Sequence, residues 1–268
     1  MSALTVRTVE KPWGRDQLPT PFVAPYGKRI GEIWFEPTVD VYSLLVKYIF
    51  TSENLSVQVH PNDAQAAELG EYDTGKEECW LVIDAEPGAA LGIGFKEPLD
   101  QAAMRAAALD GSIADLLDWH GVQAGDFFYI PSGTVHAIGA GISLIEIQQN
   151  SDVTYRLYDY GRPRALHLDK GLAVARGEPY DLALRRHLEP TGTVELARGL
   201  YFTAHRVDGT PDAALLAEYA GPMLVIPRRG EVELNGDVIF PGECVAAPDV
   251  SAITFGAGSQ SILVRAAA

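Results

Sequence analysis

The sequence predicts a mainly β protein, and three observations support this fold class. Residues 55–60 alternate strictly between apolar and polar side chains, as expected for a strand with one packed face. Residues 41–50 are rich in β-branched and aromatic side chains, which favour strands. Residues 194–268 form a β-rich block in which glycines recur between short apolar runs, at positions Gly209, Gly221, Gly230, Gly236, Gly242 and Gly256.

Composition limits the class of protein. With 268 residues and 47% hydrophobic content, the chain can bury a sizeable core as one large domain or two small ones. A formal net charge of −15 argues against nucleic acid or an anionic membrane as a partner, because both require a basic surface. The charged N-terminus lacks a signal-peptide core, and no apolar run approaches the roughly 18 residues of a membrane span. Since its two cysteines, Cys79 and Cys244, are far apart, we expect a cytoplasmic protein.

The first half of the chain contains strands and a few short helices. Residues 1–40 are punctuated by proline and glycine and are expected to be irregular, with short strands and turns. Residues 63–69 are expected to form a helix that Asn62 or Asp63 caps and Gly70 ends.

A small helical insertion is predicted around residues 99–120, between strands of this first half. Asp100 can cap the alanine-rich run 101–109, and Gly111 can stop it. Ser112 can cap a second helix that follows directly.

Two predicted strands carry chemistry on one face. Period-two geometry places Ser56, Gln58 and His60 on the same face of residues 55–60, and Lys76 beside Glu78 on residues 76–84. Unpaired buried polar groups cost roughly 1–3 kcal/mol each, so such a row is unexpected unless something binds there.

The most specific local pattern is Gly125 to His136, in which glycine, five residues, proline, one residue, glycine and two residues precede histidine. The pattern predicts a tight corner between two strands that presents His136. It resembles the second motif of the cupin family, whose small β-barrel holds a metal in its mouth. Strands are then expected at 142–149 and 153–158, before a Gly-Arg-Pro turn.

An internal repeat predicts two domains. Gly242, Glu243 and Pro248 reproduce the spacing of the first corner, but Ile253 stands where His136 would be. We therefore expect two cupin-type jelly-roll barrels: residues 1–170 form the metal-binding domain with the helical insertion, and residues 171–268 form a linker and a degenerate C-terminal barrel without a metal site.

Four side chains offer a plausible ligand set for a divalent metal. His60 and His136 provide imidazole, Glu78 a carboxylate and Gln58 an amide oxygen, a combination that suits zinc. On their own, Lys76 and Arg156 can serve either catalysis or a structural ion pair. The remaining histidines lack patterned neighbours and are interpreted as structural or surface residues: His120, His167, His187 and His205.

Several segments together resemble class I mannose-6-phosphate isomerase in its short bacterial form. The resemblance extends over nearly the whole chain and is carried by residues 11–14, 30–34, 55–61, 75–80, 125–138 and 151–156. It implies one zinc ion per chain, or another divalent metal, bound by Gln58, His60, Glu78 and His136. It further implies that Lys76 and Arg156 act in catalysis and that Ser56 lies near a phosphate.

Two positions depart from that family pattern. Glu77 stands where the family commonly has threonine or proline, which adds a negative charge on the strand face opposite the proposed metal ligands. Ile138 stands where long eukaryotic members have a tyrosine, so any role of that tyrosine is absent or filled elsewhere.

The expected activity is the interconversion of mannose 6-phosphate and fructose 6-phosphate through an enediol. This reaction requires polarised substrate oxygens and a group that moves a proton between two carbons. Lys76, Glu146 and a metal-bound water are all candidates for that group, and Glu146 is also expected to contact substrate. Arg162, with Ser56, is expected to hold the phosphate of a small sugar-phosphate substrate.

Two alternatives remain: a cupin isomerase of a related sugar, and a non-catalytic sugar-binding cupin. For the isomerase and for both alternatives, we expect a monomer or a weak homodimer that binds neither nucleic acid nor membrane.

Overall fold

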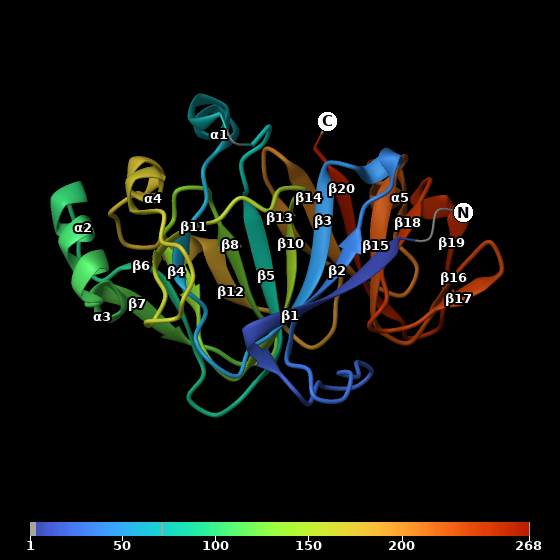
Figure 1. The fold of residues 1–268 in the computed structure, drawn as a ribbon. Helices are drawn as coiled ribbons and strands as arrows, with labels where there is room; N and C mark the ends of the chain where they lie inside the picture. The colour runs from blue at the N-terminus through green and yellow to red at the C-terminus, as the bar shows by residue number, and fades with distance from the viewer. Residues whose placement is uncertain (1–3, 71, 268) are drawn as a thin grey trace.

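The computed structural model describes residues 4–70 and 72–267 of the chain. Within these residues it contains twenty β-strands, five α-helices and three short 3-10 helices, and the strands form four sheets (Figure 1). The prediction of a mainly β protein is confirmed. None of the helices in the described residues has the length and apolar character needed to cross a membrane.

Two sheets are built from residues before 170, except that β12 joins one of them from the following segment. In spatial order, the seven-stranded sheet contains β1 (Thr5–Arg15), β2 (Ile30–Glu36), β3 (Leu44–Phe50), β10 (Ile142–Gln149), β5 (Glu78–Ala85), β8 (Asp126–Ile130) and β12 (Arg185–His187). The first five-stranded sheet contains β11 (Tyr155–Tyr158), β4 (Val57–Val59), β9 (His136–Ile138), β6 (Ala90–Phe95) and β7 (Leu117–Gly121).

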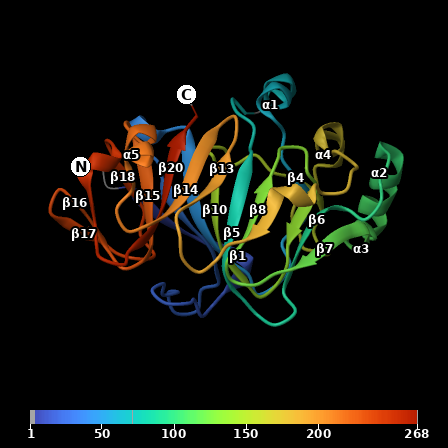
Figure 2. The same cartoon turned by 180° about the vertical axis from the view of Figure 1, so that it is seen from behind.

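Two further sheets belong to the C-terminal half, drawn in orange and red in Figure 2. The second five-stranded sheet contains β13 (Val194–Arg198), β14 (Phe202–Asp208), β20 (Gln260–Ala266), β15 (Met223–Arg229) and β18 (Val245–Ala247). The three-stranded sheet contains β17 (Asp237–Ile239), β16 (Val232–Leu234) and β19 (Ile253–Phe255).

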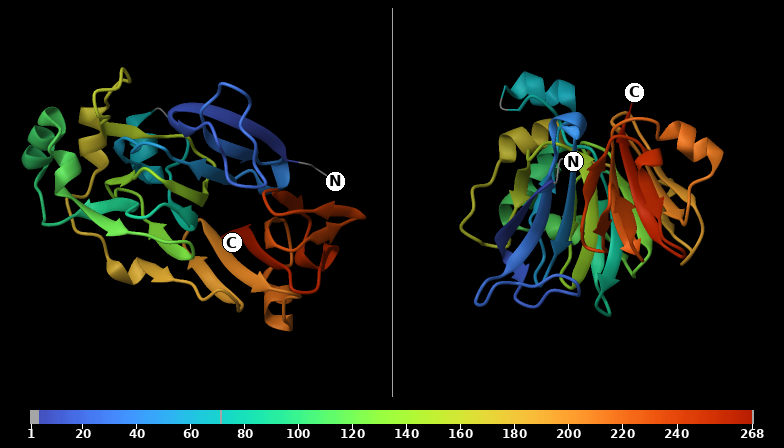
Figure 3. Two further views of the ribbon diagram at one scale, coloured as in Figure 1. Left: turned by 90° about the horizontal axis from the view of Figure 1, so that it is seen from below. Right: turned by 90° about the vertical axis from the view of Figure 1, so that its right-hand side faces the viewer.

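The seven-stranded sheet is covered on both faces, because side chains of neighbouring residues point to opposite sides of a strand. On one face, Trp80 and Phe128 pack with Ile93 of the first five-stranded sheet. On the other, residues such as Leu81 pack with Phe202 and other side chains of the C-terminal half. The two halves therefore share a core, visible as adjacent blue-to-green and red strands in Figure 3. This confirms the expectation that the C-terminal strands cover a face of the first half.

Short helices flank the sheets. They are α1 (Asp63–Leu69), α2 (Gln101–Asp110), α3 (Ile113–Leu116), α4 (Leu168–Val174) and α5 (Ala213–Glu218), with 3-10 turns at Val39–Val41, Leu182–Leu184 and Val250–Ala252. The first helix was predicted correctly: Asn62 forms a reciprocal capping box with Gln65, and Gly70 ends the helix in the left-handed region at φ 67°.

The helical insertion is present, with two differences from its predicted form. Asp100 caps α2 and Gly111 ends it at φ 88°, as expected. Ser112 makes no side-chain cap to α3, because its hydroxyl donates to Asp110 Oδ1 at 2.6 Å instead. The chain is already extended from Leu117, where β7 begins and pairs with β6, so the end of the predicted insertion belongs to a sheet.

The strand expected over residues 41–50 is shorter than predicted. A 3-10 turn occupies Val39–Val41, and the strand begins only at Leu44. In β6 the register against β7 shifts between Gly92 and Phe95, so this glycine-containing strand has a bulge or irregularity there.

Candidate functional site

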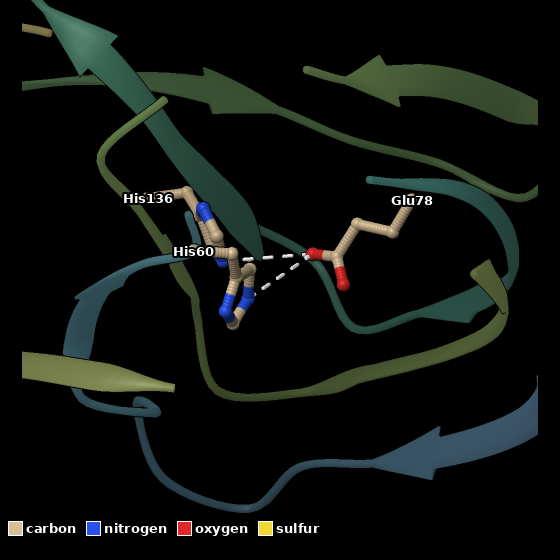
Figure 4. Close-up of side chains that lie close together, drawn as sticks. All are labelled: His60, Glu78 and His136. Atoms are coloured by element: carbon tan, nitrogen blue, oxygen red, sulfur yellow. Dashed lines mark ion pairs between the residues drawn. The ribbon is translucent and has the colours of Figure 1, made fainter. Parts of the chain in front are cut away.

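Three metal-capable side chains meet inside the first half of the molecule. His60 follows β4, Glu78 begins β5 and His136 begins β9, so each lies at a strand end (Figure 4). The Nε2 atoms of His60 and His136 lie 3.8 and 3.5 Å from Oε1 of Glu78. All three side chains are buried, and their ligand-type atoms lie within 4.8 Å of one another.

The hydrogen bonds of the two imidazoles orient them for a metal. Nδ1 of His60 donates to the carbonyl of Val153 at 2.7 Å, and Nδ1 of His136 donates to that of Thr134 at 2.9 Å. Both Nε2 lone pairs therefore face Glu78, whose buried Oε1 has no hydrogen-bond donor among the described residues. Two imidazole lone pairs and an unsatisfied carboxylate oxygen are the donor set that a divalent cation such as zinc requires.

Burial shifts the pKa values of these three groups toward their neutral forms. Burial, with Glu146 nearby, raises the pKa of Glu78 to about 7, although Lys76 opposes this shift. Burial lowers the pKa of His136 to about 4 and that of His60 well below its usual value. The histidines are thus held as the neutral ligands that a metal needs.

Gln58 adjoins the cluster, with its amide oriented away from ligation. Its Oε1 accepts a hydrogen bond from Ser56 Oγ at 3.1 Å, and its Nε2 lies 3.3 Å from Nε2 of His136. A 180° rotation of the terminal amide would exchange these two atoms and bring the oxygen toward the cluster. The contact of Ser56 with Gln58 agrees with the face predicted from the strand pattern, and the pairing of β4 with β9 adds His136 to it.

A second buried network contains Lys76, Glu146 and Lys47. Nζ of Lys76 lies 2.7 Å from Glu78 Oε2 and 3.4 Å from Glu146 Oε1. Nζ of Lys47 donates to the same Glu146 oxygen at 3.1 Å, and Trp80 Nε1 donates to Oε2 at 3.2 Å. This confirms that Lys76 and Glu78 are neighbours, as the alternation of their strand indicated.

The register of the seven-stranded sheet explains this network. Glu146 on β10 lies directly across from Lys47 on β3 and from Trp80 on β5. Burial would raise the pKa of Glu146, but Lys76 and Lys47 outweigh it and lower that pKa to about 2. Burial would lower the pKa of Lys76, but Glu146 and Glu78 raise it. Both groups are consequently held in their charged forms.

A cavity of about 310 Å³ opens above these networks. Gln58 and Lys76 line it and also contact the His60, Glu78 and His136 cluster, so they connect the cavity to the candidate metal ligands. Cationic side chains outnumber carboxylates in its lining: five lysines and arginines (Lys11, Lys47, Lys76, Arg156, Arg164) against three acids (Glu32, Glu146, Asp152). An acidic protein thus presents a cavity suited to an anion.

Several lining residues were missed or misjudged from the sequence. His167, interpreted as structural or surface, lines the cavity. Lys47 and Glu32 were not singled out, although each is a charged residue with apolar neighbours along its strand, which is a detectable anomaly. Lys11 was placed within the family pattern but given no role, and it forms a 3.2 Å ion pair with Glu32.

The two arginines proposed from the sequence occupy different environments. Arg156 lines the cavity and lies opposite Gln58 in the β4–β11 register. Arg162 is not among the lining residues; its Nε donates to the Asp159 carbonyl at 3.2 Å, and its Nη2 donates to the Asn54 carbonyl. The structure therefore brings Ser56 and Arg156 to the cavity but leaves Arg162 in the turn beyond β11, because two backbone carbonyls and the Asp159 carboxylate, whose Oδ1 lies 3.4 Å from Arg162 Nε, hold its guanidinium there.

The two departures from the family pattern lie apart from the cluster. Glu77 accepts a hydrogen bond from the hydroxyl of Tyr129, on the face of the sheet opposite Lys76 and Glu78. Ile138 lines the cavity and supplies only apolar surface.

The chain resembles known isomerases in sequence. No family model matches it. It is 46% identical over 216 residues to mannose-6-phosphate isomerase of Bacillus subtilis, an alignment that covers 75% of this chain and 67% of the relative. It is 40% identical over 183 residues to the mannose-6-phosphate isomerase of Streptococcus mutans, which covers 65% of this chain and 57% of the relative.

The chain also resembles solved structures. A mannose 6-phosphate isomerase from Bacillus subtilis matches with a TM-score of 0.77 at 24% identity, over 98% of both chains. A putative mannosephosphate isomerase from Archaeoglobus fulgidus matches with the same score at 19% identity, over 98% of this chain and 96% of the other. At these identities the likeness establishes the fold.

Proposed function

Because the chain belongs to the mannose-6-phosphate isomerase family, we propose that it interconverts mannose 6-phosphate and fructose 6-phosphate. The alignments span 57% to 67% of the lengths of the curated relatives, so the activity of the whole relatives is carried over here as a proposal. The observation that carries it is the buried His60, Glu78 and His136 cluster beneath a cation-lined cavity. An aldose–ketose isomerase needs electrophilic groups at the sugar carbons and positive charge for the phosphate.

The proposed cofactor is one zinc ion per chain, with another divalent metal as a substitute. His60, Glu78 and His136 would hold it, with Gln58 as a fourth ligand after rotation of its amide. When bound, zinc supplies a Lewis acid that polarises a substrate oxygen.

Lys76 has a proposed role beside the metal ligands. Held protonated by Glu78 and Glu146, it can donate a hydrogen bond to the substrate oxygen on which negative charge develops. Glu146 fixes the ammonium group by accepting from Lys47 as well. Because these groups are buried and already paired, little reorganisation is needed when the substrate arrives.

Arg156 has a complementary role. Its register opposite Gln58, one of the proposed ligands, supports a role for Arg156 close to the reacting carbons. Ser56, which donates to Gln58, orients that amide at the cavity surface. Glu146 lines the cavity, and this position supports the proposal that Glu146 contacts substrate.

We further propose that the four sheets form two jelly-roll barrels, with residues 1–170 and 171–268 as domains. The pairing of β12 with β8 means that the linker of the second domain completes the sheet of the first. A cytoplasmic location and a monomeric or weakly dimeric state are part of the same proposal.

The test is an isomerase assay on mannose 6-phosphate and on free mannose, with and without a chelator. We expect turnover of the phosphorylated sugar, loss of activity on chelation and recovery when zinc is restored. Turnover of free mannose at an equal kcat/KM would favour the related-sugar isomerase. Binding of sugar without turnover in metal-loaded protein would favour the non-catalytic cupin.

A further inference from the structure

We propose that Arg164, oriented by Asp159, binds the phosphate of the substrate at the outer end of the cavity. This inference rests on the proposed function and assigns its phosphate contact to a residue that the sequence pattern did not single out. Arg164 acts as the specificity residue, and Asp159 is a positioning residue that reaches the substrate only through Arg164.

The order of residues along the cavity supports this assignment. Gln58 and Lys76 mark the inner end, because both contact the candidate metal ligands. Arg156 comes next, since it lies opposite Gln58 in the strand register. Arg164 and His167, from the segment after β11, complete the lining. In the proposed binding mode, a sugar with its reacting carbons at the metal extends its far end past Arg156 toward Arg164.

Asp159 fixes the Arg164 guanidinium in a planar fork. Its two carboxylate oxygens accept from Nε and Nη2 of Arg164, each at 2.6 Å, and Asp159 is only 2% exposed. The fork uses two of the five N–H groups of the guanidinium. Nη1 and the second hydrogen of Nη2 remain to meet an anion, and a pre-oriented arginine loses little freedom on binding it.

Backbone contacts hold the segment against the cavity. Arg156 Nε donates to the Ala165 carbonyl at 3.2 Å, and the His167 backbone N–H donates to the Arg156 carbonyl at 2.8 Å. The chain that carries Arg164 is thus fastened to β11 at Arg156. The two guanidinium groups approach from the strand and from the returning segment.

The same turn removes Arg162 from the cavity. Tyr160 and Gly161 both adopt positive φ, at 53° and 75°, and reverse the chain just before Arg162. The Arg162 guanidinium lies against the Tyr160 ring, 5.4 Å from its centroid, and donates to the Asn54 carbonyl. Arg162 therefore closes the turn, whereas Arg164 faces the cavity.

Two neighbouring cations explain how so acidic a protein can hold a dianion. Burial lowers the pKa of Arg156, and the charge of Arg164 lowers it further, so the guanidinium groups interact through space. A phosphate bound between them would replace this repulsion with charge-assisted hydrogen bonds.

The experiment compares Arg164→Ala with Arg162→Ala in zinc-loaded protein. For each, the KM for mannose 6-phosphate is measured, together with the dissociation constant of inorganic phosphate by calorimetry. We expect Arg164→Ala to raise the KM and the phosphate dissociation constant by about tenfold or more, with a smaller change in kcat. A hydrogen bond to a charged group contributes about 1.5–3 kcal/mol, and about 1.4 kcal/mol corresponds to a factor of ten. Asp159→Asn should raise the KM and the phosphate dissociation constant by a smaller factor than Arg164→Ala, and should change KM more than kcat.

Arg105→Ala is the matched control, because Arg105 forms a 2.6 Å pair with Asp169 outside the cavity lining. It should leave both constants within about twofold. If Arg162→Ala weakens phosphate binding and Arg164→Ala does not, the proposal is overturned. If wild-type protein turns over no sugar phosphate yet binds phosphate in an Arg164-dependent way, the anion site stands and the isomerase proposal fails. If Arg164→Ala does not fold, Arg164→Lys is measured instead. We again expect a higher dissociation constant for inorganic phosphate.

Discussion

The two halves of the molecule contain a similar corner with different side chains. In the first half, Gly125 at φ 94° precedes β8, and the chain passes Pro131 to enter β9 at His136. In the second half, Gly242 at φ 95° precedes β18, and the chain passes Pro248 to enter β19 at Ile253. The spacing repeat in the sequence therefore corresponds to a repeated local structure.

The interiors behind these corners differ in polarity. His136 joins a fully buried network with Glu78 and Lys76. Ile253 packs with apolar side chains such as Val225 and Leu263. Buried charges cost free energy unless they are paired or bind an ion. Behind the first corner Lys76 and Glu78 are paired, whereas the surroundings of Ile253 are apolar. We therefore expect the first half to carry the chemistry and the second to stabilise it.

The largest effect is expected from removing the polar corner residue. His136→Ala should lower kcat/KM by at least about a hundredfold and reduce bound metal. Mutating a residue that only hydrogen-bonds to a metal ligand already lowers metal affinity or activity by about 10–100-fold, and His136 is itself a proposed ligand. Activity assays and elemental analysis test this.

Ile253→Val is the matched change in the second half. It should cost about 0.5–1.5 kcal/mol of stability and leave metal content unchanged. Equal metal loss in both variants would remove the proposed division of roles.

The next effect tests whether the halves fold as one unit. Phe202 is completely buried in the core that both halves share, so Phe202→Ala should lower the free energy of unfolding by about 3–5 kcal/mol. Leu200→Ala is the control, because Leu200 is 82% exposed and should change stability by less than about 0.5 kcal/mol. Denaturant unfolding monitored by far-ultraviolet circular dichroism and by fluorescence should give one coincident transition. Two separated transitions would show that the halves unfold independently.

A third prediction concerns metal removal. Chelation should abolish activity but leave both β halves folded, because their cores are built from apolar side chains whose packing does not depend on the ion. Zinc at about 100 times its dissociation constant should stabilise wild-type protein by about 2.7 kcal/mol. Thermal unfolding should show this gain in wild type and in Ile253→Val but not in His136→Ala. A collapse of the circular dichroism spectrum on chelation would contradict it.

Local sequence patterns were sufficient for elements whose cause is local. Asn62 and Gly70 define α1, because a cap and a left-handed glycine act within a few residues. The proximity of Lys76 and Glu78 was predicted from strand alternation, although β5 begins only at Glu78. Ser112 was misjudged, since its hydroxyl had an equally near acceptor in Asp110.

Non-local contacts were the part that could not be predicted. Lys47 and Glu146 are 99 residues apart and meet only through the register of β3 and β10. Arg164 lines the cavity in place of the predicted Arg162. This arrangement depends on the positive φ values of Tyr160 and Gly161 in the turn. Nothing in the Gly-Arg-Pro pattern specifies which way such a turn directs its arginines.

The smallest effect concerns the one buried histidine of the C-terminal half, His205. Its Nδ1 donates to the hydroxyl of Tyr219 at 2.9 Å, and that hydroxyl donates to the Leu263 carbonyl. Burial lowers the pKa of His205 below its usual 6.5; Glu218 and Glu195 oppose this, and Arg198 adds to it.

His205 therefore takes up a proton at a lower pH in the folded protein than in the unfolded chain. The stability that neutral His205 contributes is fully present above pH 6.5 and is lost as pH falls from there through the folded pKa. His205→Gln should consequently show a smaller drop in melting temperature between pH 7.5 and 5.5 than wild-type protein, measured with zinc bound so that His60 and His136 do not titrate. An equal drop in melting temperature for the two proteins would mean that His205 has the same pKa in the folded and unfolded states. The second half would then contribute apolar packing alone, with no pH dependence from its buried histidine.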